Sequence, residues 1–259
     1  MAQIKPKDLV KDRSDPILFK LLIFMVSDKG GTGKSTVTRG LVDILNYHKI
    51  NYLAYDGDKR NSQLYRHYHN VGNGVNKLNF SIEGGADELI EAMDRCDAPV
   101  MVVDLPGGGV ELLEQLNSQT NFLADAADMG YAVTMVSVLS RIKDSVNALR
   151  LLMDLTGDSA RHIAVKNLYW GDEQKFSLFD GSATKQRLID AGGLVITVPD
   201  LFDDTYSIID EHSLSFRAAV DDLRLTRPHR SRVNHWLRQL ESQIELADKL
   251  LGVRGIDNG

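Results

Sequence analysis

A group of glycines with one lysine carries the clearest chemistry in the sequence. Residues 28–36 read Asp-Lys-Gly-Gly-Thr-Gly-Lys-Ser-Thr and follow an apolar run at 21–26. Glycine lets the backbone turn tightly and approach phosphate oxygens, and the following helix N-terminus directs N–H donors at the anion. Lys34 supplies positive charge to the terminal phosphates, and the hydroxyl of Ser35 suits Mg²⁺. The segment predicts a nucleotide-binding site formed by Gly30, Gly31, Thr32, Gly33, Lys34, Ser35 and Thr36.

Acidic residues follow two further apolar runs. Asp56 and Asp58 come after the run at 52–55, and Asp104 comes after the run at 100–103. In open α/β sheets, ligands bind where such strands end, so Asp104 is placed to hold Mg²⁺ through water. The alternatives are a turn at Asp-Gly-Asp and a helix cap at Asp104. Three glycines at 107–109 indicate a segment that nucleotide state could order or release.

The pattern Lys-Gly-Gly-x-Gly-Lys-Ser resembles the deviant Walker A motif of the ParA/MinD group of P-loop ATPases. The resemblance implies that Lys29 reaches across a dimer to the partner's nucleotide and that Lys34 binds phosphate in the ordinary way. It implies that Asp58 orients the attacking water and that Asp56 supports the switch. The implied catalytic residues are Lys29, Lys34 and Asp58, and the implied metal-binding residues are Ser35, Asp58 and Asp104.

Other positions match the group less closely. Asn167 and Pro199 follow apolar runs at the places where ParA-like proteins hold adenine, so the resemblance implies that both contact the nucleotide. After Asp58 the group usually continues Pro-Gln-x-Asn, whereas this chain has Lys59, Arg60 and Asn61. The two cations leave the chemistry of this segment open.

Alternation of short apolar runs with amphipathic stretches predicts the fold. Strands are expected at 21–27, 52–55, 100–103, 131–139, 162–166 and 194–198, with helices at 34–47, 86–95, 110–125, around 142–153 and at the C-terminal end. This order predicts one doubly wound, mostly parallel sheet with helices on both faces. We expect a single ATPase domain at 21–259, preceded by an N-terminal extension at 1–20.

Charge and cysteine content limit the partners and the compartment. The formal net charge is −6, and Cys96 is the single cysteine, so an intrachain disulfide is excluded and a cytoplasmic location is expected. Relatives that bridge a metal or an iron–sulfur cluster through paired cysteines are excluded as well. No run is long enough to span a membrane. The apolar face of the last helix, beginning at Leu237, is interrupted by acids and predicts packing on the domain rather than membrane binding.

An arginine-rich segment is positively charged, although the chain as a whole is negative. Residues 217–238 hold six arginines and two aspartates, a local charge of +4. Such asymmetry favours a patch for the phosphate backbone of DNA, and ParA-type proteins bind DNA through basic residues in this part of the chain. Ion pairing within the protein is an equally weighted alternative. The expected DNA-binding residues are Arg217, Arg224, Arg227, Arg230 and Arg232.

Taken together, the residues and the resemblance predict a short ParA-type ATPase that uses ATP and Mg²⁺. We expect it to dimerise on ATP binding, to bind DNA without sequence preference, and to be nucleoid-associated if that binding holds. An adaptor or centromere-binding protein would connect it to a plasmid or other cargo, and hydrolysis would be slow and partner-stimulated. The alternatives are a metabolic P-loop ligase of the same fold group and a nucleotide-binding scaffold of low turnover, such as a conjugation accessory protein.

Overall fold

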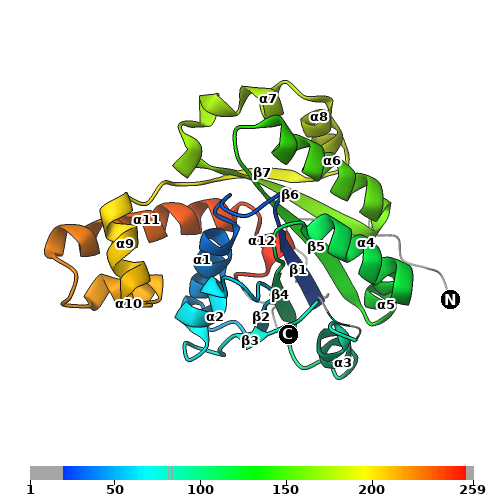
Figure 1. The fold of residues 1–259 in the computed structure, drawn as a ribbon, viewed down its shortest axis with the longest axis horizontal. Coiled ribbons are helices and arrows are strands. Elements are labelled where there is room, and N and C mark those ends of the chain that lie inside the picture. The colour runs from blue at the N-terminus through cyan, green and yellow to red at the C-terminus, as the bar shows by residue number, and fades with distance from the viewer. Residues whose placement is uncertain (1–19, 81, 83, 255–259) are drawn as a thin grey trace.

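The fold is built on one sheet of parallel strands. The computed structural model describes residues 20–80, 82 and 84–254. Seven strands lie in the order β3-β2-β4-β1-β5-β6-β7 (Figure 1), and every pairing between them is parallel. The strands are β1 (Lys20–Val26), β2 (Tyr52–Asp56), β3 (Asn76–Lys77), β4 (Val100–Asp104), β5 (Tyr131–Leu139), β6 (Ala160–Asn167) and β7 (Leu194–Val198). The predicted doubly wound sheet is confirmed. Of the predicted extension at 1–20, residues 1–19 lie outside the described residues.

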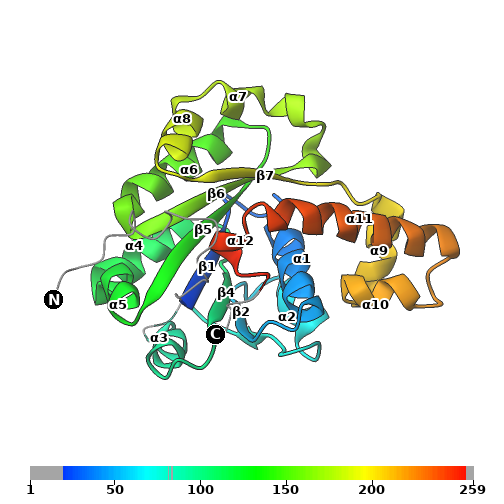
Figure 2. The ribbon, with the colours of Figure 1, turned by 180° about the vertical axis from the view of Figure 1, so that it is seen from behind.

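Helices cover both faces of the sheet (Figures 1 and 2). One face carries α1 (Lys34–Tyr47), α2 (Gln63–Tyr68), α9 (Asp203–Glu211), α10 (Phe216–Asp221), α11 (Arg227–Glu245) and α12 (Asp248–Leu251). The other face carries α3 (Asp87–Asp94), α4 (Gly109–Thr120), α5 (Phe122–Asp128), α6 (Lys143–Thr156), α7 (Ser177–Asp180) and α8 (Ala183–Asp190). Helices α9 and α10 and the N-terminal part of α11 project beyond the sheet as a lobe. Within the described residues, no helix combines the length and the apolar character needed to cross a membrane.

The central strand β1 is buried on both faces. Ile23 packs into the core beneath α1 and α11, whereas its neighbour Phe24 packs into the core beneath α4 and α5. Both side chains are fully buried, as expected for a parallel strand covered on two sides. The continuous apolar run in the sequence is explained by this double burial.

The strand order reverses around β1, and this places the loops that follow β1, β2 and β4 together. Asp104 of β4 is in register with Met25 of β1 on one side and with Asp56 of β2 on the other. The carboxyl ends of these three strands therefore meet at the same edge of the sheet. Open α/β sheets bind ligands at such a reversal point.

Two predicted helices were wrong in extent. The helix expected at 110–125 is divided into α4 and α5 at Asn121, which has a φ of 53° and ends α4. Asparagine tolerates this left-handed conformation, and the side chain of Asn117 accepts the N–H of Leu123 to start α5. The last helix was expected to continue to Leu251, but it ends at Glu245, and the short helix α12 follows Ala247. The apolar residues of α11, including Leu237 and Leu240, are fully buried, so the predicted packing of this helix on the domain is confirmed.

Candidate functional site

The loop between β1 and α1 adopts a conformation that requires glycine. Gly31 and Gly33 have φ angles of 85° and 88°, in the left-handed region that residues with a Cβ rarely adopt. A Cβ at Gly33 would also lie 2.1 Å from Nδ2 of Asn167, far inside contact distance. Because Gly33 is the N-cap of α1, the loop leads directly into the helix N-terminus. Its N–H groups are thus available to an anion in the way a phosphate loop requires.

The carbonyl group of Thr32 is anchored to the end of β6. Nδ2 of Asn167 donates to this oxygen at 2.7 Å, and Nε1 of Trp170 donates to it at 3.3 Å. Asn167 is 5% exposed, and its Oδ1 accepts the N–H of Tyr169, so its amide is fixed at both ends. The structure shows Asn167 bracing the phosphate loop, while its contact with adenine stays a prediction.

Lys34 and Asp104 form a buried ion pair behind the loop. Nζ of Lys34 lies 2.5 Å from Oδ1 of Asp104, and their side chains are 7% and 1% exposed. The hydroxyl oxygen of Thr38, one turn along α1, lies 3.1 Å from the same carboxylate oxygen and 3.0 Å from the carbonyl oxygen of Lys34, so the two acceptors share its proton. The structure therefore brings together the lysine that the sequence assigned to phosphate and the aspartate that it assigned to the metal.

Asp56 and Asp58 use their carboxylates to shape the segment after β2. Asp56 accepts the N–H groups of Tyr65 and Asp58, yet burial and then the nearby Asp104 raise its pKa to about 6. Oδ1 of Asp58 accepts the N–H groups of Arg60 and Asn61 at 2.9 and 3.1 Å. The turn considered as an alternative for Asp-Gly-Asp is thus present. The catalytic and metal-binding roles of Asp58 stay predictions.

The oxygen atoms at this edge of the sheet fit a magnesium ion. Oδ2 of Asp104 is buried and has no hydrogen-bond partner among the described residues, so one acceptor remains for a metal-bound water. Ser35 and Asp58 line the adjoining cavity and contribute a hydroxyl and a carboxylate. Mg²⁺ prefers such oxygen ligands and keeps several of its waters, which agrees with indirect binding through Asp104.

A cavity of about 330 Å³ opens above the loop, a size suited to a small ligand. It brings together all nine of the predicted nucleotide-binding residues, namely Gly30, Gly31, Thr32, Gly33, Lys34, Ser35, Thr36, Asn167 and Pro199. Its far wall also contains Tyr206 and Trp236, which sequence reasoning missed because α9 and α11 carry no local motif. Nε1 of Trp236 donates to the carbonyl of Pro199 at 2.7 Å and fixes this wall.

Lys29 lies at the rim of this cavity with its ammonium group accessible. Its side chain is 56% exposed, and its nearest acidic partner is Asp144, the second residue of α6, at 3.5 Å. Asp144 is itself 67% exposed, so this ion pair is solvated and worth less than about 1 kcal/mol. The lysine is therefore free to exchange this partner for another anion. Its role in trans stays a prediction.

The arginine-rich segment divides into paired and unpaired side chains. Arg217 pairs with the buried Asp43 and stacks on Tyr47, and Arg224 binds both carboxylate oxygens of Asp222. The ion-pair alternative therefore describes Arg217 and Arg224, whose assignment to DNA weakens accordingly.

Three of the predicted DNA-binding arginines are left without acidic partners. Within the described part of the chain, Arg227, Arg230 and Arg232 form no ion pair. Arg232 instead stacks on the exposed ring of Phe202, with its guanidinium carbon 4.5 Å from the ring centre. DNA binding stays a prediction for these residues.

The comparisons with known proteins agree with this geometry. Residues 23–167 match the model of the CobQ/CobB/MinD/ParA nucleotide-binding domain. The chain belongs to this family. The expected ParA/MinD-type fold is thereby confirmed, and ATP with Mg²⁺ as cofactors agrees with the family's nucleotide-binding character.

Individual relatives are distant in sequence. Protein MobD of Acidithiobacillus ferrooxidans is 24% identical over 87% of this chain and 97% of its own length. The septum site-determining protein MinD of Pyrococcus horikoshii, complexed with Mg-ADP, superposes with a TM-score of 0.50 at 16% identity, covering 88% of this chain and 97% of MinD. A ParA family ATPase from Chlorobium tepidum superposes with a TM-score of 0.48 at 15% identity, covering 85% of this chain and 98% of that ATPase.

Replacing Gly33 by alanine should weaken nucleotide binding, lowering the affinity by at least about tenfold. The new Cβ would collide with Asn167 and impose a left-handed conformation that costs about 1–2 kcal/mol. The matched control is Gly157→Ala, because Gly157 has a φ of 51° but open space around its Cβ position. Isothermal titration with Mg-ATP should show normal affinity for the control. Equal affinities for both variants would contradict this account of the loop.

Proposed function

We propose that this protein is a dimerising partition or positioning ATPase that moves a plasmid or other cargo over DNA through an adaptor. ATP binding closes two subunits around their nucleotides, the dimer holds DNA without sequence preference, and slow, partner-stimulated hydrolysis releases it. The observation that carries the proposal is the position of Lys29. Within residues 20–80, 82 and 84–254, the only ion pair of this exposed lysine at the rim of the phosphate cavity is the solvated one with Asp144.

Each residue of the site has a definable task in this proposal. Bound Mg-ATP supplies the phosphoanhydride that water cleaves, so the protein must position and stabilise charge. Lys34 exchanges Asp104 for phosphate oxygens, Ser35 offers its hydroxyl to the metal, and Asp104 turns to a metal-bound water. Asp58, whose carboxylate lines the cavity, holds the attacking water. Lys29 of the partner neutralises charge that develops on the phosphates.

The N-terminus of α11 supports DNA binding. Its first turn holds Arg227 and Arg230, contains no acidic residue, and receives no side-chain cap from Thr226. Cations at a helix N-terminus oppose the helix dipole, so this arrangement is unfavourable unless an anion approaches. Two arginines at a helix N-terminus together suit a phosphate of the DNA backbone. The projecting lobe in Figure 1 carries this turn away from the sheet.

A second candidate, a nucleotide-binding scaffold of low turnover, is favoured by one observation. The Oδ1 atom of Asp58 already accepts hydrogen bonds from the backbone N–H groups of Arg60 and Asn61. A carboxylate committed to a turn orients water less effectively. The scaffold would share nucleotide binding and dimerisation with the first candidate and differ only in the rate of hydrolysis.

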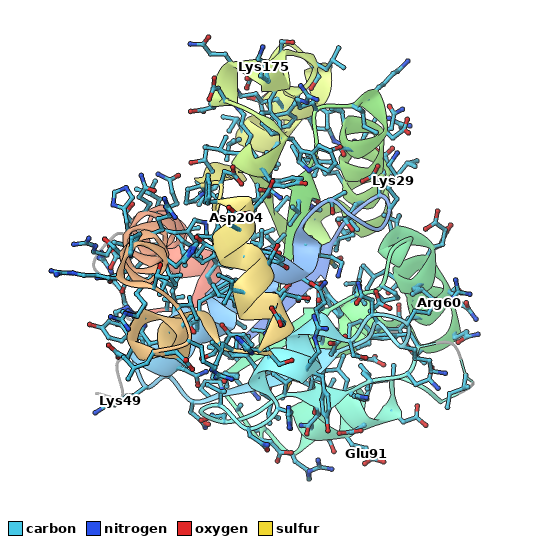
Figure 3. The ribbon with its side chains drawn as sticks, turned by 60° about the vertical axis from the view of Figure 1, so that its left-hand side comes forward. Lys29, Lys49, Arg60, Glu91, Lys175 and Asp204 are labelled. Atoms are coloured by element: carbon cyan, nitrogen blue, oxygen red, sulfur yellow. The ribbon has the colours of Figure 1, made fainter. Side chains whose placement is uncertain are left out.

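The Lys29→Ala variant should remain monomeric in Mg-ATP, whereas the wild type dimerises. Lys29 is exposed, so its removal leaves the fold and the binding of nucleotide by each subunit intact. Lys175→Ala is the matched control, since Lys175 is also exposed and lies elsewhere on the surface (Figure 3). Sedimentation velocity with ATP, with ADP and without nucleotide measures the association. Dimers of Lys29→Ala equal to those of the wild type would refute the role of Lys29 in trans.

A double variant, Arg227→Ala with Arg230→Ala, should weaken binding to random-sequence duplex DNA. Loss of two phosphate contacts should reduce the slope of log affinity against log salt by about 1 to 2. Arg224→Ala is the control, because Asp222 already neutralises Arg224 and little change is expected. Fluorescence anisotropy in Mg-ATP across a salt series provides both quantities. An unchanged slope in the double variant would place the DNA surface elsewhere.

A further inference from the structure

The side chain of Arg39 is a fully buried cation close to the nucleotide cavity. It lies on α1, is 0% exposed, and forms no ion pair with any acid among the described residues. Its guanidinium carbon lies 4.5 Å from the ring centre of Phe216, and its Nε atom has no acceptor in the part of the chain that the structure describes. One terminal nitrogen donates to the hydroxyl of Tyr206 at 3.1 Å. A buried and unpaired guanidinium is unfavourable unless its charge is used.

The polar groups around Arg39 do not neutralise it. Asp43, one turn further along α1, is engaged by Arg217 and by the hydroxyl of Tyr68. His67 approaches Arg39, but its Nδ1 atom lies 2.8 Å from the carbonyl of Leu214 and donates to it. Burial and the charge of Arg39 lower the pKa of His67 to about 4, so the imidazole is neutral at pH 7. The positive field of Arg39 therefore persists in surroundings of low dielectric.

Tyr206 connects this cation to the phosphate loop. Arginine can only donate, so the oxygen of Tyr206 accepts from Arg39 and its own proton must point elsewhere. The nearest acceptor is Oγ1 of Thr36, at 3.2 Å, with Oε1 of Gln63 farther away at 3.5 Å. When Thr36 accepts this proton, its own hydroxyl proton is left to donate. Thr36 and Tyr206 both line the cavity, so a ligand oxygen there can receive it.

We propose that Arg39, Tyr206 and Thr36 form a chain of hydrogen-bond donors that ends on a phosphate oxygen of the bound nucleotide. Hydrogen bonds in series polarise one another, and the buried cation at the start strengthens each donor along the chain. Tyr206 is then a positioning residue that acts on the nucleotide through Thr36. This inference rests on the nucleotide site of the proposed function, but not on dimerisation, DNA binding or hydrolysis.

The chain also links α9 to the phosphate loop. Tyr206 belongs to α9, whereas Thr36 and Arg39 belong to α1, so nucleotide binding through Thr36 draws on a residue of the projecting lobe. Figure 3 looks onto α9, marked by Asp204. The hydroxyl of Tyr206 is the only group of α9 among the described residues that hydrogen-bonds to the loop segment 28–36.

The test measures the affinity for Mg-ADP in the wild type, Tyr206→Phe, Thr36→Ala and the double variant. Tyr206→Phe keeps the ring over Arg39 and removes only the hydroxyl, which should weaken binding about 3- to 10-fold. Thr36→Ala should weaken it at least as much. Because the two groups act in series, the double variant should bind within about twofold of Thr36→Ala.

Three controls separate this chain from a structural role. Thr36→Ser, which keeps a hydroxyl, should bind like the wild type. Tyr47→Phe removes the hydroxyl of a tyrosine outside the cavity and should change nothing. Thermal melting without nucleotide reports any loss of fold separately.

Two results would overturn the chain while the wild type binds nucleotide. One is an affinity of Tyr206→Phe within twofold of the wild type. The other is a double variant whose loss equals the product of the single losses, because independent groups would behave in that way. Absence of nucleotide binding by the wild type would instead contradict the proposed function itself, and the chain with it.

Discussion

The ammonium group of Lys34 and the carboxylate of Asp104 meet at 2.5 Å in a place almost closed to water. Burying two charges costs several kcal/mol for each ion, and their attraction offsets this only when the geometry is favourable. Removing one partner of such a pair typically costs about 3–5 kcal/mol. The position of each residue is therefore fixed by the other, and the loop and strand that carry them are fixed together.

The rest of the site is arranged around this pair. Backbone N–H groups of Gly57 and Leu105 donate to the carbonyls of Asp104 and Met25, so the segments after β2 and β4 are tied to the strands beside them. A Cβ at Gly107 would lie 3.0 Å from the backbone nitrogen of Gly30, which shows how closely the glycine-rich segment after β4 approaches the phosphate loop. The Lys34–Asp104 pair therefore lies where three segments are joined, namely the phosphate loop, the segment after β2 and the segment after β4.

Sequence reasoning recovered the features that depend on local chemistry. The glycines, Lys34 and the apolar runs ending at Asp56 and Asp104 predicted the sheet and its ligand-binding edge, because parallel strands must be apolar throughout. The division at Asn121 was missed, because no glycine or proline marks it and asparagine adopts its left-handed conformation without a strong signal.

Contacts between distant segments could not be predicted from the sequence. The pairing of Arg217 with Asp43 joins α10 to α1, and the contact of Tyr206 with Thr36 joins α9 to the phosphate loop. The place of Trp236 in the wall of the nucleotide cavity could not be predicted either, because it depends on how α11 crosses the end of β7. The contacts of Tyr206 and Trp236 are also those by which α9 and α11 line the nucleotide cavity.

In the proposed function, the ion pair of Lys34 and Asp104 separates when a nucleotide and its metal bind. The most direct measurement is the affinity for ATP with Mg²⁺ and with a chelator, in the wild type and in Asp104→Asn. In the variant Lys34 is released, so ATP without Mg²⁺ should bind at least as tightly as it does to the wild type. The gain in affinity from Mg²⁺ should fall by at least about tenfold, because Asp104 no longer supports a metal-bound water. A variant that keeps the wild-type gain from Mg²⁺ would contradict the account.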